Sequence, residues 1–199
     1  MFMIFSDSVM EVVREGKKTI TINGRSLAAV AKNLCFLYHA CVASEGLLLD
    51  GATQIPSSGF DDRLQQYYLE HLEEETGEIA VLKSDLAGAK IETGFPDNFS
   101  MAMVGTQYYL IRHVHPVALL GYLAVQEADP TPLGMVEELE RLHGKDLFRF
   151  LRMHALKDQE HRKEILELLD QTPQKLQGLI TLSALNSLGH YRQAAASWR

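Results

Sequence analysis

Apolar residues recur every three or four positions along most of the chain, which is the spacing of one face of an α-helix. Glycine and proline divide this pattern into long blocks, and no repeat or low-complexity segment interrupts it. The blocks predict helices at residues 8–15, 27–50, 61–88, 98–128, 134–142, 147–169 and from 173 to the C-terminal region. We therefore expect a single all-α domain over residues 1–199, folded as a compact seven-helix bundle.

Particular residues mark where these helices begin, bend and end. Ser26 is a suitable N-cap for the second helix, and Pro173 suits the start of the last one. Pro116 lies inside the block at residues 98–128 and should bend or break that helix. Residues 19–23 are the only strand-like stretch and are expected to form an extended linker, and residues 51–59 are expected to form a loop.

The amino-acid composition limits the kinds of partner that the protein is expected to bind. The chain has 199 residues, 46% of them hydrophobic, and 19 basic against 26 acidic side chains give a formal charge of -7. This acidic balance argues against binding to nucleic acid or to an anionic membrane. The longest apolar stretch, residues 114–125, is shorter than the roughly 20 residues of a membrane span. We expect neither a nucleic-acid nor a membrane partner.

The two cysteines and the N-terminal residues bear on localisation. Cys35 and Cys41 lie in one apolar segment, where buried thiols are expected rather than a disulfide. The first residues lack the basic start, long apolar run and small-residue cleavage site of a secretory signal. We therefore expect a cytoplasmic protein.

Ionisable residues interrupt the apolar stripe of the helix at residues 147–169. His154, Asp158 and His161 lie on consecutive turns of the face that Leu151 and Ile165 define. Two imidazoles and a carboxylate in an apolar setting can bind a transition metal, because an uncompensated buried carboxylate is unfavourable. A hydrogen-bonded network without metal is the alternative interpretation.

The helix at residues 61–88 repeats this spacing. His71, Glu75 and Glu78 stand at i, i+4 and i+7, and Glu75 is expected to lie deepest in the core. The neighbouring acids, Glu73 among them, should face solvent. The alternative interpretation is that the whole group is a solvated acidic edge of the helix.

Glu127 ends the apolar segment VALLGYLAVQE and continues its buried stripe. In carboxylate-bridged diiron bundles, glutamates and histidines project inward from facing helices in this way. An exposed helix terminus is the alternative for Glu127.

Other residues are weaker candidates. His113 and His115 are expected to line a pocket rather than to bind metal, because no carboxylate is close to them in the sequence. Cys41 could act as a nucleophile only with an activating base, and His39 lies two residues away, where it cannot face the thiol. Tyr108 could direct its hydroxyl into the pocket as a catalytic group.

Three segments together resemble the heme-oxygenase-like diiron oxidases, which share a seven-helix fold with the TenA thiaminases, pyrroloquinoline-quinone synthase and the chlamydial protein CADD. FLRMHALKDQEH carries the family's His-x3-Asp-x2-His motif as His154, Asp158 and His161, and HPVALLGYLAVQE resembles the helix with the central glutamate, Glu127. HLEEETGEIAVLKSDL resembles the helix of the first ligands. The family usually has His at the position of Glu78, and several members have Glu at that of His71, so two ligand types are exchanged.

The resemblance implies a function as well as a fold. It implies two Fe(2+) ions per chain held by His71, Glu78, Glu127, His154, Asp158 and His161, with O2 as cosubstrate and Glu75 as a nearby catalytic carboxylate. The expected reaction is oxidation of a small carboxylate-bearing substrate, derived from an amino acid or a fatty acid, in specialised metabolism. We also expect a homodimer. A metal-independent enzyme like the TenA or pyrroloquinoline-quinone synthase proteins, or a non-catalytic binding protein, remains open, as does a degraded first metal site.

Overall fold

The structure is a computed structural model that describes residues 4–55 and 60–198, with only the backbone of residues 158–161. The described residues form α-helices and two short 3-10 helices, and no strand occurs among them. The α-helices are α1 (Phe5–Lys18), α2 (Leu27–Gln54), α3 (Phe60–Gly88), α4 (Asn98–His113), α5 (Leu119–Glu127), α6 (Leu133–His143), α7 (Arg149–Gln171) and α8 (Gln174–Ser197). The all-α prediction is therefore correct for the described part of the chain.

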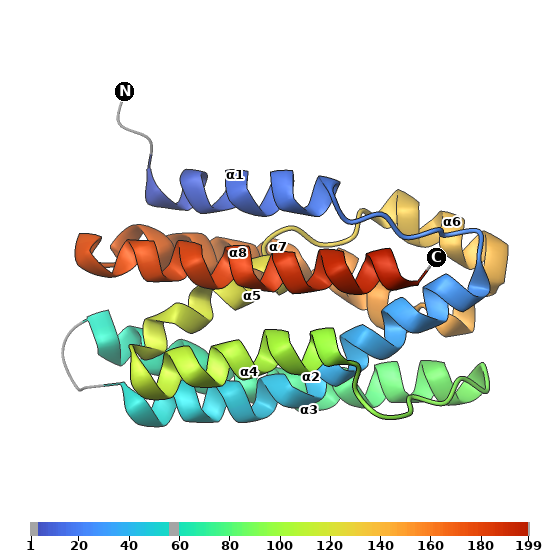
Figure 1. Ribbon diagram of the computed structural model, residues 1–199, viewed down its shortest axis with the longest axis horizontal. Helices are drawn as coiled ribbons and strands as arrows, with labels where there is room; N and C mark the ends of the chain where they lie inside the picture. The colour runs from blue at the N-terminus through green and yellow to red at the C-terminus, as the bar shows by residue number, and fades with distance from the viewer. Residues whose placement is uncertain (1–3, 56–59, 199) are drawn as a thin grey trace.

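The long helices lie side by side along the molecule (Figure 1). Helix α2 packs against α3 and α4, and α8 packs against α1, α4 and α5. The short helix α5 also contacts α7, and α7 reaches across to α3. This arrangement brings α3, α5 and α7 together although they are far apart in the sequence.

Local capping explains where several helices begin. The Ser26 hydroxyl accepts a hydrogen bond from Ala29 N at 3.3 Å, as the sequence predicts for the start of α2. The Asp97 carboxylate accepts hydrogen bonds from Phe99 N and Ser100 N at the start of α4. Residues 20–23 have no regular secondary structure and connect α1 to α2, as expected for a linker.

The prediction of seven helices is wrong, because the described residues form eight α-helices. Pro116 breaks the predicted block at residues 98–128 completely, so that α4 ends at His113 and α5 begins at Leu119 after a 3-10 turn. The ring Nδ1 of His115 accepts a hydrogen bond from Val117 N at 3.1 Å and so caps this turn. This cap gives His115 a structural role.

The expected loop at residues 51–59 is also partly helical. Helix α2 continues to Gln54 because Ala52 is buried in the core, and residues 56–59 lie outside the described part of the chain. Within that part, α2 is the one helix whose length and composition would allow it to cross a membrane. It packs against α3 and α4, as a core helix does.

Helix α5 is buried almost throughout and approaches α8 closely. A side chain at Gly121 would overlap the carbonyl oxygen of Ile180 and would lie 2.8 Å from Ala184 N. Only glycine allows the two backbones to come this near. Gly121 therefore sets the depth at which α5, and with it Glu127, lies in the bundle.

Replacing Gly121 by alanine should lower the free energy of unfolding by about 1–3 kcal/mol, because the added methyl group must push backbone apart. Gly178→Ala is the matched control: this exposed glycine of α8 has nothing within 4 Å of an added Cβ. In the control, the free energy of unfolding should rise by about 0.5–1 kcal/mol, because alanine has a higher helix propensity than glycine. Urea unfolding of both variants tests the close approach of α5 to α8. Equal changes in the free energy of unfolding in the two variants would contradict it.

Candidate metal centre

Five ionisable side chains from three helices meet inside the bundle. Helix α3 contributes His71, Glu75 and Glu78, which are only 4–5% exposed, and α5 contributes Glu127, which is 3% exposed. Helix α7 contributes His154, whose side chain is 14% exposed. The two alternatives of a solvated helix edge on α3 and an exposed terminus at Glu127 are therefore wrong.

The innermost group joins α3 to α5. One potential ligand atom from each of His71, Glu75 and Glu127 lies within 4.8 Å of the other two, a spacing that could surround a metal ion. His71 Nε2 is 3.8 Å from Glu75 Oε1. One carboxylate oxygen of Glu75, Oε2, is buried and has no hydrogen-bond partner among the described residues. A buried carboxylate oxygen in this position fits a bound cation.

His154 lies between two carboxylates. Its Nε2 is 2.9 Å from Glu78 Oε2, and its Nδ1 is 3.5 Å from Glu127 Oε2. Lys157 Nζ approaches the other oxygen of Glu78 at 3.3 Å from one turn further along α7. The imidazole thus connects all three helices of the site.

The start of α7 is fixed by a residue of α3. The buried carboxylate of Asp85 accepts hydrogen bonds from Phe150 N at 2.9 Å and from Arg149 Nε at 2.7 Å. Phe150 precedes His154 by one helical turn, and the two rings lie 4.3 Å apart between centroids. Asp85 stands two turns after Glu78 on α3, so this cap sets the register in which Glu78 and His154 face each other.

Burial and mutual repulsion act on the carboxylates. Burial, together with the charges of Glu127 and Glu78, raises the pKa of Glu75 to about 8. Burial alone would also raise the pKa of Glu78, but the hydrogen bond and charge of His154, with Lys157, hold it below its ordinary value. Near neutral pH the metal-free site therefore keeps a proton on Glu75, which a bound cation would replace.

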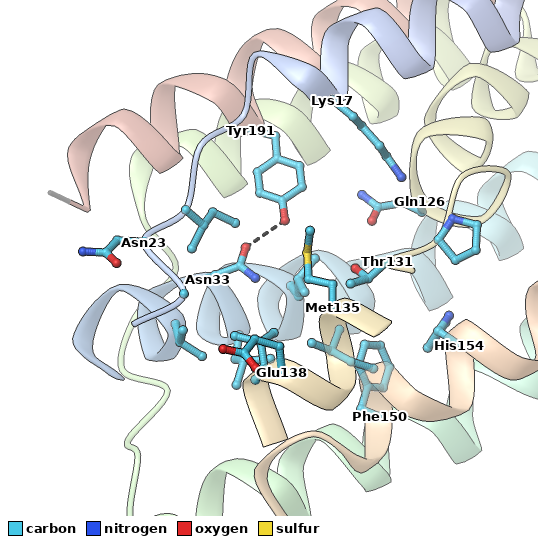
Figure 2. A pocket seen from close by; sticks show the side chains of 18 of the residues that line it. Lys17, Asn23, Asn33, Gln126, Thr131, Met135, Glu138, Phe150, His154 and Tyr191 are labelled. Carbon is cyan, nitrogen blue, oxygen red and sulfur yellow. Dashed lines mark hydrogen bonds between the residues drawn. The ribbon is translucent and has the colours of Figure 1, made fainter. Parts of the chain in front are cut away.

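A cavity of about 500 Å³ leads to this cluster from the side of α1 and α6. Glu127, His154 and Cys41 lie at its wall beside many aliphatic side chains. Figure 2 shows Phe150 and His154 on one side of the cavity and Lys17 with Gln126 on the other. The Lys17 ammonium also donates to Asp129 O, and the Tyr191 hydroxyl donates to Asn33 Oδ1 at 2.7 Å.

The structure brings together five of the predicted ligand and carboxylate residues. The side chains of the two others, Asp158 and His161, lie outside the described part of the structure. The expectation for Tyr108 is wrong, because this residue does not line the cavity: its ring packs under the Arg112 guanidinium, 5.1 Å away, and its hydroxyl lies beside Gly46. Arg112 is held by Asp50, so this part of α4 is anchored to α2 instead.

Other residues reach the site without a signal in the sequence. Tyr67 stacks on His71, with ring centroids 5.6 Å apart, and Lys17 of α1 lines the cavity. Burial and the charges of Glu75 and Glu127 raise the pKa of the Cys41 thiol, which disfavours the thiolate. Cys41 therefore has the surroundings of an inert thiol, and both cysteines are free.

Replacing Glu75 by glutamine should change how stability depends on pH in the metal-free protein. Folded Glu75 keeps its proton up to about pH 8, whereas an unfolded glutamate loses it near pH 4.5. Between these values the folded state holds the extra proton, so the free energy of unfolding falls as the pH rises. From pH 5.5 to pH 8 this loss is about 3 kcal/mol, at about 1.4 kcal/mol per pH unit.

Urea unfolding across this range should show a shallower decline in Glu75→Gln than in the wild type. Glu70→Gln changes an exposed acid of the same helix and should keep the wild-type decline. Identical pH profiles for Glu75→Gln and the wild type would show that Glu75 ionises normally in the folded protein.

Two solved structures are similar to this chain. A domain of unknown function with a heme oxygenase-like fold from Shewanella denitrificans OS217 aligns at a TM-score of 0.74 and 16% identity, over 97% of this chain and 86% of that one. A TenA homolog from Pseudomonas syringae pv. tomato str. DC3000 aligns at a TM-score of 0.73 and 11% identity, over 98% and 92%. No family model and no curated protein matches the sequence. The chain has the heme oxygenase-like fold, as its resemblance to that group of proteins implied.

Proposed function

We propose that this protein is a non-heme iron oxidase that holds two Fe(2+) ions and uses O2 to oxidise a small carboxylate-bearing molecule. The observation that supports this best is the buried group of His71, Glu75 and Glu127, whose potential ligand atoms lie within 4.8 Å of one another. Glu78 and His154 extend the group without a break. Such a concentration of acids inside an apolar bundle is typical of a cation site.

The donor set suits iron. Imidazole nitrogens and carboxylate oxygens are ligands that ferrous iron accepts, and carboxylates can bridge two ions. His71, Glu78, Glu127 and His154 would be ligands, completed by Asp158 and His161 of the same α7 motif. Two ferrous ions bring a charge of +4, and Glu78, Glu127 and Asp158 return -3. Glu75, or the carboxylate of the substrate, would supply the fourth negative charge.

Iron would supply the reactivity toward O2, and the side chains would control access and protonation. Glu75 would release its proton when the cations bind, because metal ligation requires the ionised carboxylate. His154 would exchange one of its two carboxylate contacts for a metal bond. The aliphatic wall of the cavity would keep water from the reacting centre.

The cavity suggests how the substrate lies. Its volume of about 500 Å³ suits a small molecule, and its apolar wall would pack against an aliphatic or aromatic body. Lys17 and Arg25 both line the cavity and could attract a carboxylate. A substrate held this way would present its body to Glu127 and His154, whereas direct ligation to iron would place the carboxylate there instead.

A second candidate is a metal-independent enzyme that uses Glu75 as a general acid or base. A carboxyl group with a pKa of about 8 can both donate and accept a proton near neutral pH. The heme oxygenase-like fold, found also in a TenA homolog, is compatible with this alternative. The number of iron ions bound per chain distinguishes the iron oxidase from the metal-independent enzyme.

Anaerobic titration with Fe(II) should give two bound ions per chain, and exposure to air should then consume O2. Glu127→Ala should lose at least one ion, because it removes the carboxylate that faces both His71 and His154. Glu138→Ala is the control, since Glu138 lines the outer cavity but pairs with Arg141. A wild-type protein that binds no iron would exclude the oxidase and leave the acid–base enzyme.

A further inference from the structure

A second, smaller cavity borders the candidate metal centre between α3 and α7. Its volume is about 240 Å³, and its wall is formed by Tyr67, Glu70, His71, Glu73, Glu74 and Glu164. A neighbouring hollow of about 160 Å³ shares Tyr67, Glu70 and Glu164 with it. We refer to the first of these, by its six lining residues, as the acidic cavity.

The acidic cavity has a strongly negative wall. Four of its six lining residues are glutamates, and all four are exposed to solvent. No lysine or arginine lines it among the described residues. Arg63 lines only the neighbouring hollow, where its guanidinium pairs with Glu167 at 2.7 Å. Cations should therefore accumulate at this opening.

Tyr67 is part of the wall of the acidic cavity, and its hydroxyl oxygen is buried. Its side chain is 94% buried, and its hydroxyl has no hydrogen-bond partner among the described residues. Burial, followed by the charges of Glu127, Glu164 and Glu74, raises the pKa of this phenol. Tyr67 is thus a buried polar group in the wall that the acidic cavity shares with His71.

His71 connects the acidic cavity directly to the candidate metal centre. It is part of the cavity wall, and it also offers a ligand atom within 4.8 Å of those of Glu75 and Glu127. The wall of the large cavity carries both signs of charge, because Lys17 and Arg25 lie there together with Glu127 and Glu138. Among the described residues, the acidic cavity has carboxylates but no lysine or arginine in its wall, whereas the wall of the large cavity has both.

We propose that the acidic cavity is the route by which a divalent cation reaches His71, Glu75 and Glu127, separately from the organic substrate. This inference rests on the proposed metal centre and adds to it the access route of the metal. The exposed glutamates draw the hydrated ion in, and Tyr67 and His71 offer the next ligand atoms along the way. Removing the outer carboxylates should slow uptake while the number of bound ions stays the same.

Uptake can be followed with Co(II) alone, by stopped-flow visible absorption at low ionic strength. The triple variant E70Q/E73Q/E164Q should bind as many Co(II) ions as the wild type but about tenfold more slowly, within the range of electrostatic steering. The control E11Q/E92Q/D146N removes the same charge from exposed positions outside the acidic cavity and should bind at the wild-type rate. Added salt should slow the wild type and leave the triple variant nearly unchanged.

Three results would overturn the inference. Equal uptake rates in the wild type and the triple variant would exclude the acidic cavity as the route, although the metal centre itself would stand. Equal slowing in the triple variant and its control would assign the effect to net charge alone. Absence of Co(II) and Fe(II) binding in the wild type would overturn the metal centre and its route together. Thermal unfolding of both variants verifies that they are folded.

Discussion

Three carboxylates lie inside the helical bundle, and the rest of the site is arranged around their charge. Glu75, Glu78 and Glu127 are 3–5% exposed, and unpaired charges at that depth are strongly unfavourable. His154 compensates two of them by standing between Glu78 and Glu127, and Lys157 adds to the compensation at Glu78. Glu75 is compensated by a proton in the metal-free protein. A bound cation would satisfy all three carboxylates at once, which is why the proposed function begins from this interaction.

The helices around this charge are held in register by contacts outside the cluster. Gly121 lets α5 approach α8 closely enough to bury Glu127, and Asp85 caps α7 one turn before His154. Two cavities then border the cluster, one largely apolar with both basic and acidic residues in its wall and one with an acidic wall. This division is consistent with separate access for an organic acid and for a cation.

Much of the site could be predicted from periodicity, because an i, i+4, i+7 spacing places side chains on one helix face. That reasoning identified His71, Glu75 and Glu78 on α3, and the structure buries all three. Periodicity shows which face of a helix is buried, but it does not show which residues of other helices pack against that face. The sequence therefore did not reveal that Lys17 of α1 lines the cavity, that Tyr67 stacks on His71, or that Asp85 caps α7. Tyr108 failed for the same reason: its helix face turns toward Arg112 and α2. Pro116 was predicted to bend or break its helix, and counting residues 98–128 as one helix gave one helix too few.

The central claim is that the buried carboxylates are metal ligands, and anomalous X-ray diffraction at the iron edge tests it most directly. Crystals of protein loaded anaerobically with Fe(II) should show two anomalous peaks. One peak should lie within bonding distance of His71 and Glu127, and the other within bonding distance of His154 and Glu78. Well-diffracting, iron-loaded crystals without an anomalous peak among these residues would contradict the account. Glu75 would then be a protonated acid in an ordinary buried polar network.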